Sequence, residues 1–289
     1  MKARIKVSAS SANLGVGFDS LGISLNIYNI YEIETSTKFE LIGFNGYEEN
    51  NLMVASYKRL FKEKNIEIIP IRINQIECNI DIARGLGSSA SLIVAGIISA
   101  SLVIKEKYNI DIDKNELLKV ATLIEGHPDN VAPALFGGLV ASSISNNNIY
   151  YQKYEVSSKL YFYLLIPNFS LETQLARDAI SKTISFDDYK DNLSKAILLP
   201  KAFASGDIKM IKNLTANAIH EKYRYPLIKG GLNLKEKLED KESVVLISGS
   251  GPTLVLISSK ERNIKLLDSD YRVVEARVNN KGVEIIYGI

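Results

Sequence analysis

An unbroken apolar run, ASLIVAGIISASLV, occupies residues 90–103 and restricts the fold more than any other feature. It contains no proline and has no polar face, which predicts a helix buried inside a domain rather than one on a surface. The run falls short of the roughly eighteen apolar residues that a membrane helix needs. The first residues, MKARIKVSAS, lack the apolar stretch of a signal peptide. We therefore expect no membrane segment and a cytoplasmic protein.

Strand and helix patterns surround this run. Before it, alternating apolar residues predict strands at 3–9, 21–34 and 66–76, and helical spacing predicts a helix at 51–64. After it, a second helix is expected at 113–124, with Asp113 and Glu116 placed like the ends of a capping box. The segment between the first two strands, rich in Ser, Gly and Asn, is expected to be a loop.

The pattern starts again near Ser157 with a buried strand, helical segments and further strands. A chain of 289 residues is long enough for two compact domains. Strands and helices do not follow the regular βαβ order of a doubly wound sheet, which indicates the α+β class. We predict domains at residues 1–157 and 158–289.

Charge and cysteine content exclude several classes of protein. The net charge is +2 and the 35 Lys and Arg residues are scattered, so nucleic acid is not an expected partner. The single cysteine, Cys78, excludes an internal disulfide, and no His or second Cys lies near it as a metal partner. We expect Cys78 to be a small buried hydrophobic residue.

A glycine-rich loop, ARGLGSSAS, lies at residues 83–91, directly before the apolar helix. Gly85 and Gly87 allow the backbone to approach a ligand closely, and the helix N-terminus attracts anions. Ser88 and Ser89 add hydroxyl donors, cap the helix and offer ligands to magnesium. A phosphate loop of the G-x-x-x-x-G-K-[ST] type would also supply a lysine, which is missing here. The plain alternative is a glycine turn before a capped, buried helix.

Four segments together resemble a known family. SSANLGVGFD (10–19), ARGLGSSAS (83–91) and SGSGPTL (248–254) resemble the three motifs of the GHMP small-molecule kinases. Within that superfamily, SSANLGVGFD and EGHPDNVAPALFGG (125–138) resemble the homoserine kinases. The resemblance covers essentially the whole chain. One departure is Asp81, which stands where the second motif commonly has a proline.

The resemblance implies a two-domain fold, with an N-terminal mixed α/β nucleotide-binding domain and a C-terminal ferredoxin-like α+β domain. It implies that ATP and Mg²⁺ are bound and that L-homoserine is converted to O-phospho-L-homoserine in threonine biosynthesis. It also suggests a homodimer. Two alternatives stay open: another GHMP kinase acting on an alcohol such as mevalonate or shikimate, and a relative that senses a metabolite without catalysis.

The resemblance also assigns the nucleotide and metal ligands. The predicted nucleotide contacts are Arg84, Gly85, Leu86, Gly87, Ser88, Ser89, Ala90 and Ser91, with Ser250 and Gly251 from the third motif. Ser89 and Glu125 match the magnesium ligands, although Glu125 taken alone reads as a carboxylate at a helix end. Because backbone N–H groups and magnesium neutralise the phosphates in this family, no loop lysine is required.

The EGHPDN segment implies how transfer proceeds. Asn130 stands near the position where several relatives carry an aspartate base, and an amide cannot accept a proton. The resemblance therefore implies transfer by alignment and charge neutralisation, with Asn130 positioning the reacting groups. His127 is expected to contact substrate, and the sequence leaves open whether it moves a proton.

A hydroxy amino acid also needs groups that bind its carboxylate and its ammonium. Arginine forks match carboxylates, and Arg177 and Arg224 stand in the right family contexts. Asn13 and Asp19 are the expected ammonium side, and Thr173 lies one helical turn before Arg177. Each of these residues alone fits a surface ion pair or a helix cap equally well.

Overall fold

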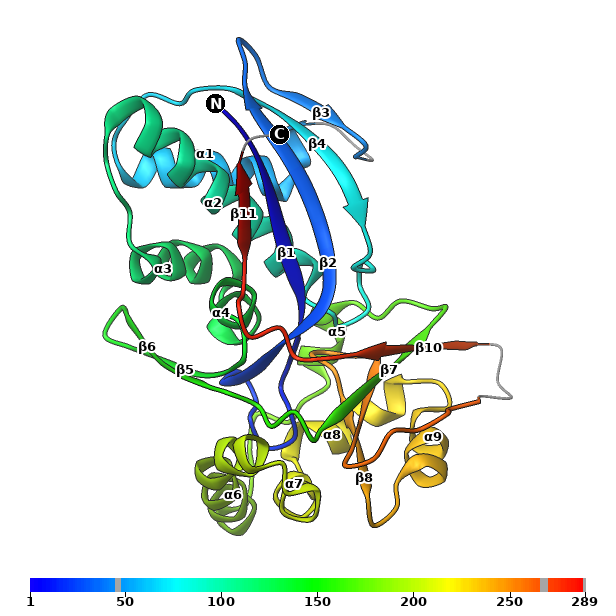
Figure 1. The fold of residues 1–289 in the computed structure, drawn as a ribbon. Helices are drawn as coiled ribbons and strands as arrows, with labels where there is room; N and C mark the ends of the chain where they lie inside the picture. Colours follow the sequence, from blue (N-terminus) through cyan, green and yellow to red (C-terminus); the bar gives the residue numbers. More distant parts are fainter. Residues whose placement is uncertain (45–47, 266–269, 288–289) are drawn as a thin grey trace.

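The computed structural model describes residues 1–44, 48–265 and 270–287, and two β-sheets organise them (Figure 1). The larger sheet has seven strands and contains the path β11-β1-β2-β4-β3, with β5 pairing with β2 and β6 with β5. Its strands are β1 (Lys2–Ala12), β2 (Leu21–Thr35), β3 (Glu40–Ile42), β4 (Ile71–Cys78), β5 (Leu139–Ser145), β6 (Asn148–Tyr154) and β11 (Glu284–Tyr287).

Four helices cover one side of this sheet (Figure 1). They are α1 (Leu52–Glu63), α2 (Ser88–Tyr108), α3 (Lys114–Glu125) and α4 (Pro128–Phe136), with a short 3₁₀ turn, η1 (Glu48–Asn50), before α1. The side chains of α2 pack in one apolar core with those of the sheet and of the other three helices. The predicted buried helix is confirmed, because burial on every side requires a helix without a polar face.

Two expectations about α2 are wrong: that its apolar segment is too short for a membrane helix, and that serines cap it. The helix is long and apolar enough to cross a membrane by length and composition, although 72% of the apolar window is buried within the protein. A core helix passes the same test, because both environments exclude polar side chains. Its N-cap is Gly87, with no side-chain capping bond, so Ser88 and Ser89 do not cap it. In α3, by contrast, Asp113 Oδ1 accepts from the backbone N–H groups of Asn115 and Glu116 as predicted.

The second sheet has four antiparallel strands in the order β10-β7-β9-β8. The strands are β7 (Tyr161–Pro167), β8 (Ser243–Ile247), β9 (Leu254–Ser258) and β10 (Tyr271–Ala276). Between β7 and β8 lie α5 (Thr173–Asp178), α6 (Phe186–Ser205), α7 (Ile208–Thr215), α8 (Ile219–Arg224), η2 (Tyr225–Leu227) and α9 (Gly231–Leu238). This strand order, fourth-first-third-second along the chain, is the ferredoxin-like order, and the described residues between β9 and β10 contain no second crossover helix.

Apolar cores cover both faces of this sheet. Phe162, Leu164 and Ile166 of β7 belong to one core, while Tyr163 and Leu165 belong to another on the opposite face. A strand buried on both faces reads as a continuous apolar run, which explains the predicted buried strand after Ser157.

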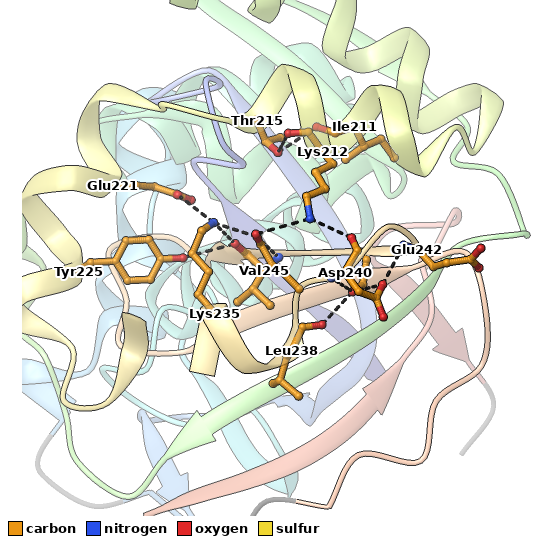
Figure 2. A network of polar contacts seen from close by, with 12 residues as sticks. Ile211, Lys212, Thr215, Glu221, Tyr225, Lys235, Leu238, Asp240, Glu242 and Val245 are labelled. Atoms are coloured by element: carbon orange, nitrogen blue, oxygen red, sulfur yellow. Dashed lines mark hydrogen bonds and ion pairs between the residues drawn. The ribbon is translucent and has the colours of Figure 1, made fainter. Parts of the chain in front are cut away.

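Helices α7, α8 and α9 hold edge strand β8 and the residues just before it through polar contacts (Figure 2). Lys235 of α9 donates from Nζ to Val245 O at 2.7 Å, and Lys212 of α7 donates to Asp240 O at 2.8 Å. Glu221 of α8 accepts from the backbone N–H of Ile247 at 3.2 Å. The Glu221 contact lies at Ile247, the last residue of β8, directly before the SGSGPTL turn.

The two sheets share a core. Leu14 and Ile23, from the first 30 residues, pack in the same cluster as Phe162 and Phe203. The end of the chain also returns to the larger sheet, since β11 pairs with β1, for example Ile285 with Ile5. The domain boundary at residue 157 stays a prediction. Residues before and after it pack in the same apolar core.

Two local expectations differ from the structure. β1 continues to Ala12, so Ser10, Ser11 and Ala12 belong to a strand rather than to the predicted loop. Cys78 is exposed, not buried, because it is the last residue of β4, beyond a register shift where the alternation of buried and exposed residues stops. The sequence marks that shift only by two consecutive polar residues, Asn74 and Gln75, after which apolar and polar residues alternate again through Cys78.

Candidate active site

A cavity of about 360 Å³ lies where the loop before α2 meets the helices and turns of the second sheet. Most of the predicted site residues line it: Asn13, Arg84, Gly85, Gly87, Ser88, Ser89, Glu125, His127, Asn130, Thr173, Arg177, Arg224 and Ser250. Leu52, Ile82, Ala83, Leu92 and Gly249 complete the wall. Of the other predicted residues, Asp19, Leu86, Ala90, Ser91 and Gly251 are not part of this lining, although each is a chain neighbour or direct partner of a residue that is.

Backbone contacts hold the three glycine-rich segments together. Ser10 N donates to Leu86 O at 3.1 Å, and Gly249 N donates to Ala12 O at 2.9 Å. Ser248 Oγ bridges the segments by contacting Gly85 O at 2.6 Å and Ser11 Oγ at 2.8 Å. Three segments that lie far apart in the sequence are therefore joined on one side of the cavity.

Gly85 and Gly87 are required by this close packing. Their φ values are +72° and +68°. A Cβ on Gly85 would lie 2.2 Å from Ser248 O, and one on Gly87 would lie 2.0 Å from Ser10 Oγ. The left-handed backbone turns the loop so that the N-terminus of α2 opens toward the cavity.

Arg84 and Asp81 tie this loop to the second sheet. The guanidinium of Arg84 donates to Pro167 O at 3.1 Å and Asn168 O at 3.2 Å. Asp81, at the position where the family commonly has proline, forms an ion pair with Arg272 of β10. The Arg84 side chain lines the cavity while already bonded to carbonyls, and its contact with a nucleotide stays a prediction.

Two oxygen groups face each other beside the N-terminus of α2. Ser89 Oγ donates to Glu125 Oε2 at 2.6 Å. Burial raises the pKa of Glu125, and the Ser89 hydrogen bond opposes that rise. No lysine or arginine pairs with Glu125 within residues 1–44, 48–265 and 270–287.

His127 is oriented by a buried carboxylate. Its Nδ1 is hydrogen bonded to Oδ1 of Asp129, whose side chain is fully buried. That hydrogen bond is the largest cause of the raised pKa of His127, and burial opposes it. Asp129 Oδ2 has no hydrogen-bond partner among the described residues.

Asn130 is fixed next to this pair. Its Oδ1 accepts from Ser10 Oγ at 2.9 Å, and its Nδ2 lies 3.5 Å from Asp129 Oδ1. The amide therefore has a defined orientation, held between β1 and the start of α4. His127 and Asn130 both reach the cavity, as predicted.

Arg177 and Asp19 are brought together, and they bind each other. Arg177 Nη1 and Nη2 donate to Asp19 Oδ2 and Oδ1 at 2.8 and 2.9 Å. Asp19 has φ +52° and Asn13 has φ +58°, a conformation that Asn and Asp tolerate better than other side chains. Asn13 Oδ1 accepts from Asp19 N at 2.8 Å, so the two residues brace one short loop.

Arg224 is a buried cation beside this pair, with only 1% of its surface exposed. It donates from Nη1 to Gly249 O at 2.8 Å and from Nε to Ala176 O at 3.4 Å, both neutral acceptors. Burial, followed by the charge of Arg177, lowers the pKa of Arg224 to about 10. Among the described residues it forms no ion pair, so its charge is available to an anion from the cavity.

Thr173 and Ser250 form the remaining polar wall, with their hydroxyl oxygens 3.2 Å apart. Sequence reasoning missed several residues that hold the site in place: Ser10, Phe18, Asp129, His220 and Ser248. Four of them lie inside the quoted motifs, but their spacing alone gave no role. Phe18 faces both arginines, with its ring 5.7 Å from Arg177 Cζ and 5.1 Å from Arg224 Cζ.

Comparison with known proteins identifies the family of the chain. The model for the GHMP kinase N-terminal domain matches residues 51–138. A homoserine kinase of Clostridium botulinum (strain Alaska E43) is 37% identical over 298 residues, covering 99% of each chain. One from Clostridium beijerinckii is 35% identical and covers 98% of each. This chain belongs to the homoserine kinase family of GHMP kinases.

Solved structures extend the likeness to the fold. A homoserine kinase from Cytophaga hutchinsonii aligns with a TM-score of 0.82 and 25% identity, over 99% of this chain and 97% of that one. A putative homoserine kinase from Listeria monocytogenes aligns with a TM-score of 0.79 and 24% identity, over 99% and 100%. The predicted α+β, two-domain kinase fold is confirmed, and the homoserine kinase family implies ATP as the phosphoryl donor.

Proposed function

We propose that this homoserine kinase family member transfers the γ-phosphoryl group of ATP to the hydroxyl of L-homoserine. The hydroxyl oxygen forms the new O–P bond, ADP leaves, and the hydroxyl proton is released, giving O-phospho-L-homoserine for threonine biosynthesis. The observation that carries this proposal is the buried Arg224 guanidinium, which has only neutral acceptors and faces the same cavity as the N-terminus of α2.

Arg224 supports an acceptor that carries a carboxylate. A buried guanidinium with no carboxylate partner has lost hydration without gaining a charge-assisted bond. A substrate carboxylate supplies that bond. Asp19 and Arg177 pair with each other. When an amino acid binds, its ammonium can pair with Asp19 in place of Arg177, and its carboxylate can pair with Arg177 as well as with Arg224.

The loop before α2 supports phosphate binding without a lysine. The left-handed Gly85 and Gly87 orient the first backbone N–H groups of α2, and Ser88 adds a hydroxyl in the cavity wall. Fixed dipoles aimed at a phosphoryl group stabilise the charge that develops during transfer. The positive field at the phosphates therefore comes from the N-terminus of α2 and from the arginines that line the cavity, Arg84, Arg177 and Arg224.

Ser89 and Glu125 fit a magnesium ion. Hydroxyl and carboxylate oxygens are the ligands that Mg²⁺ takes, and here they lie 2.6 Å apart at the cavity. Half-burial without a Lys or Arg partner in the described part of the chain leaves the Glu125 carboxylate suited to a cation. When bound, the ion would neutralise charge on the ATP phosphates.

Asn130 and His127 support transfer without a dedicated protein base. Asn130 carries no group that accepts a proton, and its amide is held by Ser10 for positioning. The Asp129 carboxylate raises the pKa of His127, which favours the cationic ring over a free base. We propose that His127 contacts substrate through the ring edge that faces the cavity.

The other readings are weaker on specific observations. Mevalonate and shikimate carry a carboxylate but no ammonium, so they leave Asp19 without a new partner. A sensing module without catalysis would not need the Ser89–Glu125 pair or the fixed Asn130 amide. A cytoplasmic location and a homodimer remain predictions from the sequence, as does the absence of nucleic-acid or membrane partners.

A coupled ADP-release assay tests the proposal. Purified protein with ATP and Mg²⁺ is given L-homoserine, L-serine, L-threonine, mevalonate or shikimate at equal concentration. We expect strong preference for L-homoserine. Preference for mevalonate or shikimate would contradict the substrate, and nucleotide binding without turnover of any alcohol would favour the sensing module.

A further inference from the structure

His220 lies behind the cavity wall and has no role in the chemistry described so far. It belongs to α8, four residues before Arg224, and is 2% exposed. Its ring lies against Phe18, with ring centroids 5.4 Å apart. A buried imidazole in this position contacts groups from several elements at once.

Its hydrogen bonds define a single tautomer. Nε2 lies 2.8 Å from Gly15 O, and because a carbonyl only accepts, Nε2 carries the proton. The neutral ring then has a bare Nδ1, which accepts from Arg224 Nη1 at 3.4 Å. Burial, followed by the Arg224 charge, lowers the pKa of His220 to about 4, so the ring stays neutral near pH 7.

These two bonds connect opposite sides of the proposed substrate pocket. Gly15 lies in the loop that Asn13 and Asp19 brace, which is the ammonium side. Arg224 is the carboxylate side, and it also bonds to Gly249 in the third motif. The imidazole therefore spans the distance between the two groups that receive the ends of an amino acid.

We infer that His220 is a positioning residue that sets the separation between the Asn13–Asp19 loop and Arg224, and with it the length of hydroxy amino acid accepted. The inference rests on the proposed function. The ammonium and carboxylate occupy one carbon of the substrate, so fixing both fixes how far its hydroxyl reaches toward the phosphates. Homoserine and serine differ by one methylene in that reach.

Two substitutions test this role. His220→Phe keeps an aromatic ring against Phe18 and removes both nitrogens, while His220→Gln keeps an N–H donor and an oxygen acceptor. We expect His220→Phe to raise KM for homoserine about 10-fold or more, as expected for a weakened bond to a charged group. It should also lower the preference for homoserine over serine, with KM for ATP unchanged. His220→Gln should recover part of both losses.

Lys222→Gln is the matched control on the same helix. Lys222 is exposed and pairs with Asp188 at 3.5 Å, away from Arg224, so the control should match wild type. An active wild type whose His220→Phe variant keeps the homoserine KM and the homoserine-to-serine ratio would overturn the inference. A wild type inactive on homoserine would instead remove the proposed function itself.

A measurement on the unaltered protein decides the matter if His220→Phe does not fold. The chain has two histidines, so ¹⁵N spectra of the imidazoles are readily assigned. We expect His220 to show the Nε2–H tautomer with a bare Nδ1 between about pH 5 and pH 8. An Nδ1–H tautomer, or titration near the ordinary value of 6.5, would contradict the inference.

Discussion

At the scale of single residues, the site depends on charges placed next to uncharged partners. Arg224 has neutral acceptors, and Glu125 has a hydroxyl, so each has lost hydration without a full counter-charge. Such groups are costly in an isolated protein and are retained where a ligand supplies the missing partner. We regard this incomplete pairing as the chief mark of the active site.

Arg224→Ala should therefore act on the amino-acid substrate alone. A lost charge-assisted bond costs on the order of 2 kcal/mol or more, which corresponds to a rise of about 30-fold in KM for homoserine. KM for ATP should stay close to wild type, and a melting curve checks that the buried substitution leaves the fold intact. An equal loss in ATP affinity would show that our division of the cavity is wrong.

Ser89→Ala tests the metal ligands. Removing the hydroxyl leaves Glu125 as the one proposed protein ligand, so we expect a higher Mg²⁺ concentration for half-maximal activity, by about 10-fold. A magnesium titration of initial rates at fixed ATP measures it. Ser101→Ala, at the far part of the same helix, is the control, and an unchanged Mg²⁺ requirement in Ser89→Ala would remove Ser89 from the metal site.

At the scale of elements, α8 links two polar regions. Arg224 lines the cavity with His220 behind it, and Glu221 belongs to the polar network around β8 (Figure 2). Burial raises the pKa of Glu221 to about 7, with Lys235, 3.8 Å away, opposing the rise. The six residues of α8 therefore include the neutral His220, the Glu221 carboxyl of raised pKa and the buried Arg224 cation.

Glu221 gives a prediction with a definite sign. Because its folded pKa of about 7 exceeds its ordinary 4.5, the stability it contributes is present below pH 4.5 and is lost as pH rises through 7. Glu221→Gln keeps an acceptor for Ile247 N–H and removes the charge. We expect the variant to melt higher than wild type at pH 8 and to differ little at pH 5.

Melting curves at several pH values measure this difference. Glu236→Gln, an exposed acid on α9, is the control and should show no such trend. If Glu221→Gln melted lower than wild type at pH 8, the ion pair with Lys235 would outweigh burial, and the assigned sign would be wrong.

Elements and motifs differ in how far the sequence predicts them. The buried helix α2 and strand β7 were predicted because burial on all sides leaves a simple apolar signature. The buried position predicted for Cys78 is wrong because the alternation around it continues past a register shift, whose one local sign is the polar pair Asn74 and Gln75. The serine cap predicted for α2 is wrong because the N-cap is the left-handed Gly87, and Ser88 is already the first helical residue.

At the scale of the whole molecule, contacts between distant segments build the site. Family motifs predicted that Asn13, Glu125, Arg177 and Arg224 share a pocket, and the cavity brings them together. Sequence reasoning did not predict that Arg177 and Asp19 bind each other or that Arg84 is engaged by carbonyls. Those pairings depend on how the two sheets meet, which no single segment records.

Contacts between distant segments also bring the end of the chain back to the larger sheet. β11 pairs with β1, and the described ends of the chain lie close together (Figure 1). An apolar core shared by both parts also joins residues near 14–25 with residues beyond 160. The β11–β1 pairing and the shared apolar core therefore both join the two halves of the chain that form the cavity, and they hold its opposing walls at a fixed separation.

The central claim is that one cavity recognises both charged ends of homoserine and phosphorylates its hydroxyl. The most direct test compares kcat/KM of the unaltered protein for L-homoserine, for 4-hydroxybutanoate, which lacks the ammonium, and for 3-aminopropan-1-ol, which lacks the carboxylate. We predict that each analogue falls by about 30-fold or more, because each leaves a buried or paired charge unmatched. Similar kcat/KM for all three alcohols would contradict the account.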